Sequence, residues 1–525
     1  ITANYMKRLL YFTALFIFIL TWSSCRKDFE FQPSNGTLGF SKDTVYLDTV
    51  FTNIGSSTYT LKVYNNSDED IYVPNIRLEN GETSGYRLNV DGMAGKNFDN
   101  VEILAKDSMF VFIEITEDIQ NHMATDFEFL YTDKILFDAG NLQQDVDLVT
   151  LIKDAVFIYP DRDETTQVTE TLTLTVDGQP VETELQGREL LPEELTFTNE
   201  KPYVIYGYAA VPAGETLTVE AGARVHFHAN SGLIVQENAS LNVNGTLSND
   251  EDLLENEVIF EGDRLEPIYS DVPGQWGTIW LFEDSQNNII NYATIKNGTV
   301  GILSDANPNA GTPINKLTIT NSQIYNSSTF GILGRNTSIK AENLVINNSG
   351  QTSFGATLGG KYNVTHSTIA NYWDSSFRQF PALLINNFVI NEDNTALIAD
   401  LTEANFNNCI IYGNDNPELI VDEIEDASVV FNFKLTNCLL RFQDSGNNFS
   451  GDNYNFNDIN HYENIIFNED PNFRAPFEND LIIGENSAAN NQGNATFATQ
   501  VPNDILGVNR TASPDLGAYQ HVIFE

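Results

Sequence analysis

The chain has 525 residues, 41% of them hydrophobic, so it is long enough for more than one domain and can bury sizeable cores. Its 73 acidic and 27 basic residues give a formal charge of −46 at pH 7. This argues against nucleic acid or an anionic lipid surface as a partner, because both need a basic footprint. We interpret the acidity as a solubilising surface, with binding of cations or basic partners as the alternative.

Residues 1–25 have the pattern of a targeting segment. Lys7 and Arg8 precede the run LLYFTALFIFIL, which is too short for a comfortable transmembrane helix. The run ends in TWSSC, which resembles the lipobox of bacterial lipoproteins, although Trp22 stands where an aliphatic residue is usual. The resemblance implies that Cys25 is diacylated and becomes the mature N-terminus. An ordinary signal peptide or an uncleaved anchor is the alternative.

The residues after Cys25 indicate where in the cell the protein is located. Arg26 rather than Asp follows the cysteine, which favours the outer membrane of a Gram-negative bacterium. Asp28 and Glu30 resemble the export tags of lipoproteins that reach the cell surface. We therefore expect a lipid-anchored, surface-exposed protein, held to the membrane by its N-terminus.

Residues 26–160 are predicted to form a tether and a β-sandwich. Alternating segments such as DTVYLDTVF, STYTLKVYNN and DSMFVFIEIT recur every 10 to 20 residues, with polar or glycine turns between them. About seven such strands indicate two packed sheets. The stretch TYTLKVYNNSDEDIYVPNI resembles the immunoglobulin-like modules of bacterial envelope proteins, which stand between an anchor and a functional domain.

Residues 161–202 are interpreted as a joint. TLTLTVDGQPVETEL reads as a hairpin with Asp177 and Gly178 at its turn. Because the end of a stack of strands exposes unpaired edges, we expect this hairpin, with KPYVIYGYAAV, to form an N-terminal cap. A flexible linker is the alternative.

Residues 203–525 carry an internal repeat. NYATIKN, TNSQIYN, AENLVINN, THSTIAN, NNCIIYGN and TNCLLRF share a small residue or Cys, an apolar anchor and a following turn residue. The anchors are separated by 29, 22, 23, 42 and 29 residues; they are Ile295, Ile324, Ile346, Ile369, Ile411 and Leu440. This spacing is typical of a solenoid in which each strand pairs with its equivalent one coil away. We expect the asparagines after the anchors to form turns and stacked amide ladders.

These residues carry a resemblance to a family. DVPGQWGTIWL followed by NNIINYATIKN, and the tail from IIFNEDPNF to SPDLGAYQ, resemble the right-handed parallel β-helix proteins of the pectate-lyase-like superfamily. The resemblance implies an all-β chain whose second part is a right-handed parallel β-helix with a C-terminal cap. It says little about function, because the fold hosts lyases, hydrolases, adhesins and spacers.

Cys409 and Cys438 occupy the same slot in successive repeats, so their side chains are expected to stack. We favour free buried thiols, with a disulfide as the alternative in an oxidising compartment. His226 and His228 share one face of a strand, but no carboxylate stands near them in the repeat. A solvated strand face is the simpler interpretation than a metal site.

The clearest irregularity is HSTIANYWDSSFRQFPALLINN, which leaves the repeat after Ile369. Aromatic faces beside a charged pair are used in sugar and peptide recognition. The candidate ligand-binding residues are Tyr372, Trp373, Asp374, Phe377 and Arg378. The alternative is a loop that folds its aromatic rings onto the side of the solenoid.

No catalytic residue is assigned. Lyases of this fold need a positioned base and a cation or basic group for the sugar carboxylate, and the basic residues here are scattered. No cofactor or metal site is expected, with Ca²⁺ as the one ion considered. The favoured function is therefore non-catalytic binding of a glycan or of other envelope proteins. A polysaccharide lyase or glycoside hydrolase is the alternative, and charged residues stacked on one parallel face would favour it over an Asn and Thr face.

Overall fold

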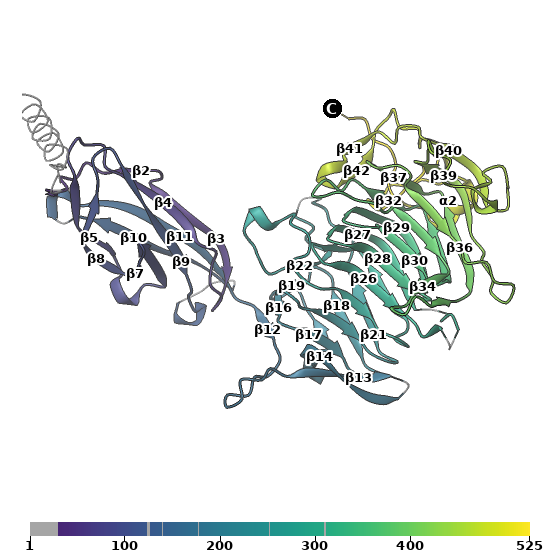
Figure 1. Cartoon of the computed structure of the whole chain (residues 1–525), viewed down its shortest axis with the longest axis horizontal. Coiled ribbons are helices and arrows are strands. Elements are labelled where there is room, and N and C mark those ends of the chain that lie inside the picture. The colour runs from purple at the N-terminus through teal and green to yellow at the C-terminus, as the bar shows by residue number, and fades with distance from the viewer. Residues whose placement is uncertain are drawn as a thin grey trace, which may run out of the picture. The chain divides into compact units, whose positions relative to one another are not determined.

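The computed structural model describes residues 30–122, 127–138, 140–176, 178–250, 253–308, 311–314 and 316–524. The predicted targeting segment, residues 1–25 with Cys25, lies outside these ranges. The chain divides into two compact units between Lys153 and Asp154 (Figure 1). Within the described ranges, none of the helices has the length and apolar content needed to cross a bilayer.

Unit 1, up to Lys153, consists of two β-sheets that share one core. The six-stranded sheet contains β1 (Gln32–Pro33), β3 (Thr44–Phe51), β5 (Ile71–Leu78), β8 (Asn97–Ile103), β10 (Glu128–Phe137) and β11 (Gln144–Lys153). The five-stranded sheet contains β2 (Gly39–Phe40), β4 (Tyr59–Tyr64), β6 (Tyr86–Val90), β7 (Met93–Gly95) and β9 (Ser108–Ile115). In the longer strands such as β6, β9 and β11, alternate residues point into the core, as the sequence pattern predicts.

Unit 2, from Asp154, consists of parallel strands in three stacks, because most strands pair with the third strand after them (Figure 1). The first stack contains β15 (Thr196–Phe197), β18 (Thr216–Glu220), β21 (Ser240–Asn244), β24 (Asn288–Asn291), β31 (Gly360–Thr365) and β36 (Leu401–Asn407). The second contains β12 (Val156–Ile158), β16 (Tyr203–Ile205), β19 (Arg224–Phe227), β22 (Val258–Gly262), β25 (Ala293–Lys296), β32 (Thr368–Asn371) and β37 (Ile410–Gly413). Four longer strands contribute to both: β27 (Leu317–Ser327), β29 (Ser338–Ser349), β39 (Lys434–Leu440) and β40 (Tyr462–Phe467).

The third stack forms a separate ten-stranded sheet. After the hairpin β13 (Thr171–Val176) and β14 (Gln179–Glu189) it contains β17 (Tyr208–Val211), β20 (Gly232–Val235), β23 (Ile279–Leu281), β26 (Val300–Asp305), β28 (Phe330–Arg335), β30 (Phe354–Thr357), β33 (Leu383–Asn386) and β38 (Leu419–Asp422). Large parallel sheets therefore make up most of unit 2, and the prediction of an all-β chain is confirmed.

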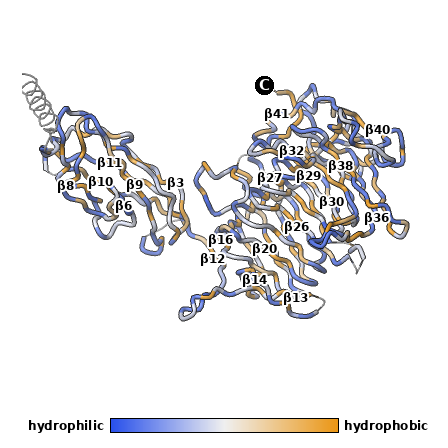
Figure 2. Tube along the Cα trace, in the orientation of Figure 1, coloured by the Kyte–Doolittle hydropathy of each residue, from blue (hydrophilic) through white to orange (hydrophobic). Residues whose placement is uncertain are grey.

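The predicted repeat register is confirmed residue by residue. Ile295 pairs with Ile324, which in turn pairs with Ile346, and the series continues through Ile369 and Ile411 to Leu440. These anchors belong to one buried cluster that fills the space between the stacks. Figure 2 shows apolar segments that recur along the strands of unit 2.

Asparagines stand two residues after the anchors and adopt a turn conformation, as expected. Asn297, Asn326 and Asn348 each have a positive φ of 55° to 67°, a conformation that asparagine tolerates better than most residues. Their amides form a ladder, because Asn348 donates to Asn326 at 2.7 Å and Asn326 donates to Asn297 at 3.3 Å. The ladder links the positive-φ positions at or near the ends of β25, β27 and β29.

The predicted hairpin is present as the antiparallel pair β13 and β14. Its Leu172 and Leu174 pack on Ala210 and Ile234 of the third stack. The KPYVIYGYAAV segment is not a separate cap, because it forms β16 and β17, which pair in parallel within the regular stacks. These strands alternate like the later ones, so the sequence offered no boundary between them.

The C-terminal part of unit 2 packs against the rest of the unit in two places. Aromatic rings between residues 442 and 467 pack against the last inward-facing side chains. The segment from β41 (Phe473–Ala475) and β42 (Asp480–Ile483) to Tyr519 instead lies against the outer side of the second stack, where Ile482 and Tyr519 cluster with Tyr325 and Val345. The first stack keeps much of its outer face open to solvent.

Candidate functional site

The five residues predicted to bind a ligand do not form one surface. Trp373 is buried, and its Nε1 donates to Ser376 at 2.9 Å. Tyr372 is partly buried with its ring edge-on to the ring of Phe477 at 5.4 Å. Burial raises the pKa of the Tyr372 hydroxyl well above its ordinary value. Both rings therefore face inward or toward the C-terminal segment.

The remaining three residues do not share one environment either. Asp374 and Phe377 are exposed, whereas Arg378 is buried and paired with Glu418. The guanidinium also donates to the backbone oxygens of Phe380 and Asn371. Both of its terminal nitrogens are bonded inside the protein, so Arg378 supports a structural role for this part of the segment.

A larger polar surface lies on the outer face of the first stack, where sequence reasoning placed no site. Two outward rows cross the strands. The first contains Thr318, Lys340, Asn363, Asn405 and Lys434. The second contains Thr320, Glu342, Thr365, Asn407, Thr436 and Glu463. Consecutive members of a row are one strand apart, about 4.8 Å.

The charged side chains of this face pair with one another. Lys340 lies 2.7 Å from Glu342, Lys361 lies 3.4 Å from Glu403, and Lys434 lies 2.7 Å from Glu463. Glu403 also accepts hydrogen bonds from the amides of Asn363 at 2.9 Å and Asn405 at 2.6 Å. The face is therefore locally balanced in charge, although the chain as a whole is strongly acidic.

Three hollows lie end to end over this face, and we call them together the groove. Their volumes are about 420, 610 and 400 Å³. Ile314 and Lys361 line both the first and the second hollow, while Asn363, Thr365 and Gln500 line both the second and the third. The groove thus runs across the strands from β27 to β40.

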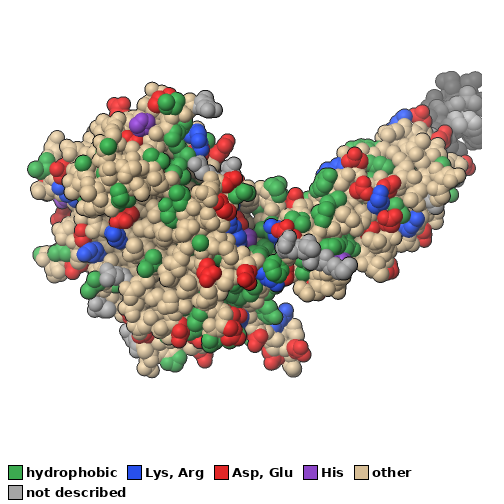
Figure 3. All heavy atoms as spheres, turned by 180° about the vertical axis from the view of Figure 1, so that it is seen from behind, with side chains coloured by type: hydrophobic (Ala, Val, Ile, Leu, Met, Phe, Trp, Pro, Cys, Tyr) green, Lys and Arg blue, Asp and Glu red, His purple; other side chains and the backbone are tan. Residues whose placement is uncertain are grey.

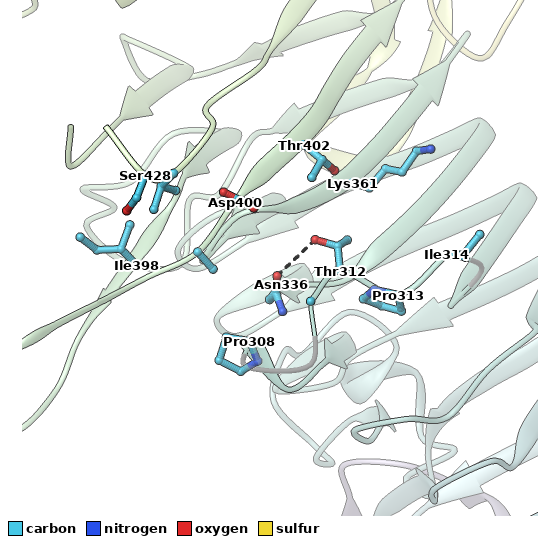
Figure 4. Close-up of a pocket in the computed structure, with 13 residues that line it drawn as sticks. Pro308, Thr312, Pro313, Ile314, Asn336, Lys361, Ile398, Asp400, Thr402 and Ser428 are labelled. Carbon is cyan, nitrogen blue, oxygen red and sulfur yellow. Dashed lines mark hydrogen bonds between the residues drawn. The ribbon is translucent and has the colours of Figure 1, made fainter. Parts of the chain in front are cut away.

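Loops and a short helix wall the groove. At one end, Pro308, Pro313 and Ile314 lie opposite Ile398 and Asp400, as Figure 4 shows. At the other end stands α2 (Ala495–Gln500), which contributes Phe497 and Gln500. Asn494 caps this helix by accepting from the amide of Thr496 at 2.9 Å. An aromatic ring and a polar floor therefore face the same space.

Two carboxylates of this face, Glu342 and Glu403, are widely spaced. On β36 the residue level with Glu342 is Asn407, four residues from Glu403 and two strands from β29. Strand geometry then places the two glutamate Cα atoms roughly 16 Å apart. Glycoside hydrolases need carboxyl groups about 5 to 9.5 Å apart. The sheet floor does not supply such a pair from these two residues.

The prediction that His226 and His228 lie on a solvated face without carboxylates is wrong. The neighbouring strand β22 brings Glu261 to 3.6 Å from the His226 Nδ1, and Asp263 follows at 2.7 Å from the His228 Nδ1. Burial lowers the pKa of His226, whereas the hydrogen bond to Asp263 raises the pKa of His228. The partners are 35 residues away in sequence, so only the pairing of strands reveals them.

Metal coordination finds no support in these side chains. Among the residues that the structure describes, no group of three or more His, Cys, Asp or Glu side chains could hold a metal ion. The surface shown in Figure 3 carries many acidic side chains and few basic ones, spread over the visible face of each unit. The carboxylates there are dispersed rather than gathered.

No protein-family model and no curated protein match the chain. Among solved structures, a family 123 glycoside hydrolase from Clostridium perfringens is 12% identical with a TM-score of 0.16, over 23% of this chain and 30% of that one. The catalytic domain of a GH87 alpha-1,3-glucanase is 10% identical with a TM-score of 0.17, over 74% of this chain and 82% of that one. The E. coli chaperone DraB is 14% identical with a TM-score of 0.16, over 29% of this chain and 80% of that one.

Proposed function

We propose that this chain is a lipid-anchored protein of a Gram-negative outer membrane that binds an extended glycan in the groove of unit 2 and does not cleave it. Cys25 is the lipidated residue in this proposal, and the protein faces the cell exterior. The immunoglobulin-like unit 1 stands between the anchor and the binding unit. Other envelope proteins are the alternative occupants of the groove.

The fold in this proposal is a right-handed parallel β-helix. Three stacked strands per coil and one inward anchor per coil support it. The handedness follows from the strong preference for right-handed connections between parallel strands of one sheet.

The groove carries the functional part of the proposal. An extended polymer fits a continuous hollow better than a closed pocket. The Asn, Thr, Lys and Glu side chains of the floor supply both donors and acceptors for hydroxyl groups. Phe497 at the wall offers an apolar face for a sugar ring.

Glycan cleavage remains the second candidate. Lysines and glutamates do lie on one parallel face, which is the arrangement that favours it over pure binding. Against it stands the wide separation of Glu342 and Glu403, and each carboxylate is already paired with a lysine. We therefore keep binding as the conclusion.

One experiment tests both glycan binding and glycan cleavage. The full chain, in a detergent without sugar groups, is exposed to a panel of neutral and acidic polysaccharides, and bound glycan is measured by affinity electrophoresis. The matched variants are Lys434→Ala and Lys153→Ala. The Lys434 pair is 37% and 44% exposed, and the Lys153 pair with Glu128 is 37% and 45% exposed, but Lys153 lies on unit 1.

We expect Lys434→Ala to weaken retention of the bound polysaccharide by about tenfold, as loss of one charged hydrogen bond would do, while Lys153→Ala has no effect. New reducing ends or unsaturated uronate absorbance would support the cleavage alternative. If no polysaccharide is retained, or both variants behave alike, glycan binding in the groove is wrong.

A further inference from the structure

Unit 1 exposes two large aromatic side chains in the middle of a sheet. Phe110 and Phe112 of β9 are 49% and 40% exposed, while their neighbours Val111 and Ile113 are fully buried. The alternation of a strand places both rings on the outer face of the five-stranded sheet. Neither ring contributes to the core of unit 1, so folding alone does not account for them.

The two rings form a platform. Their centroids are 6.2 Å apart and their planes differ by 25°. Lys62 of the paired strand β4 places its ammonium 5.4 Å from the centre of the Phe110 ring. The platform therefore combines the apolar surface of two rings with a hydrogen-bond donor, the Lys62 ammonium, which lies over the Phe110 ring.

A hollow of about 360 Å³ adjoins the platform and is lined by Phe110 and Phe112. It lies between the turn after β6 and the connection from β8 to β9. The polar groups around it are Asp91, Glu102, Asp107 and Ser108. Its size suits one or two sugar rings, and its carboxylates are acceptors for hydroxyl groups.

We propose that this platform and hollow bind a neutral glycan through the face of a pyranose ring. Near-parallel rings on one strand favour a flat partner, whereas a cage for an ammonium ion needs rings that surround the charge. Three carboxylates at the rim would repel uronate or sulfate groups. A sugar ring with an apolar face and peripheral hydroxyls matches the apolar surface and the polar rim together.

This second site is independent of the groove in unit 2. It would give the protein two points of attachment to a polysaccharide, and linked sites raise the apparent affinity for a polymer that reaches both. The two sites can be inactivated separately, so their failures are distinguishable.

The test uses the full chain in a detergent without sugar groups, with unbranched gluco-, manno- and galacto-oligosaccharides of six residues as probes. Saturation-transfer NMR identifies the ligand protons in contact, and calorimetry gives the affinity. The variants are the double substitution Phe110→Ala with Phe112→Ala, the conservative pair Phe110→Tyr with Phe112→Tyr, and Tyr46→Ala. Tyr46 is a control because it is an exposed aromatic residue of unit 1, 64% accessible, on β3 of the other sheet.

We expect at least one neutral oligosaccharide to bind and the double alanine variant to lose about tenfold in affinity, from two ring contacts of modest strength. The tyrosine pair retains binding, and Tyr46→Ala behaves as the unchanged protein. Far-ultraviolet circular dichroism checks that each variant is folded. The proposal is overturned if none of the neutral probes binds, if the folded double alanine variant binds as tightly as the unchanged protein, or if only the groove variant Lys434→Ala weakens the binding.

Discussion

The guanidinium of Arg378 and the carboxylate of Glu418 form a two-pronged ion pair inside unit 2, with Nη1 2.8 Å from Oε2 and Nη2 2.7 Å from Oε1. Their side chains are 2% and 0% exposed. Glu418 also accepts from the backbone amides of Ala382 and Asp415. The pair therefore ties the irregular segment after Asn371 to the strand β38.

Breaking this pair on one side should destabilise unit 2 strongly. Arg378→Met leaves a buried carboxylate without its partner, and we expect the free energy of unfolding to fall by about 3 to 5 kcal/mol. The double variant Arg378→Met with Glu418→Leu should recover part of that loss, because it removes the unpaired charge. Denaturant unfolding, followed by tryptophan fluorescence, measures both.

Lys361→Met is the control for that experiment. Its pair with Glu403 is 46% and 32% exposed, so its loss should cost about 1 kcal/mol or less. If Arg378→Met is no more damaging than Lys361→Met, the buried pair does not hold the segment in place.

Lys316 should make a contribution to the stability of unit 2 that rises between pH 8 and pH 10.5. Burial lowers the pKa of this amine from 10.5 to about 8, although Asp305, Asp284 and Glu283 oppose the shift. Below pH 8 the amine is charged in both states and the folded state bears the cost of burying it. Between the two values the unfolded state binds more protons, so the free energy of unfolding increases with pH, by roughly 3 kcal/mol in total.

Comparison with Lys316→Met isolates this contribution. Methionine has a similar unbranched shape and no charge. The variant should lose the hydrogen bond to the Phe282 oxygen, but its free energy of unfolding should exceed that of the lysine form at neutral pH. The difference between the two unfolding curves should shrink or change sign as pH rises above 8. A difference that does not vary with pH from 7 to 10.5 would contradict the assigned pKa.

Cys409 and Cys438 should remain thiols in the native protein. Both are free and buried, and Cys409, just before β37, lies level with Cys438 of β39, one strand apart. Burial raises the pKa of the Cys409 thiol well above its ordinary value, so little reactive thiolate forms. We expect no alkylation of either residue in the folded protein at pH 8, and alkylation of both after unfolding without reductant, read by peptide mass spectrometry. A peptide pair joined through these two residues would instead establish the disulfide.

The sequence by itself determined the strands, the parallel register and the buried anchors. Ile295 to Leu440 could be aligned because each sits in the same short pattern of a small residue, an apolar anchor and a turn residue. Each repeat must bury one apolar anchor, Ile or Leu, and this requirement is local. The pattern can therefore be recognised even where insertions of different length separate the repeats. The asparagine ladder could be expected for the same reason.

The tertiary structure alone decided which side chains meet. Arg378 and Glu418 are 40 residues apart, and His226 and Glu261 are 35 apart, with loops of irregular length between them. The outer face of a strand stack is open or covered depending on where the residues after Phe473 pack. The repeated pattern of the strands does not encode that packing. The groove and the aromatic platform are surfaces, and surface neighbours across strands are set by pairing and loop lengths rather than by local pattern.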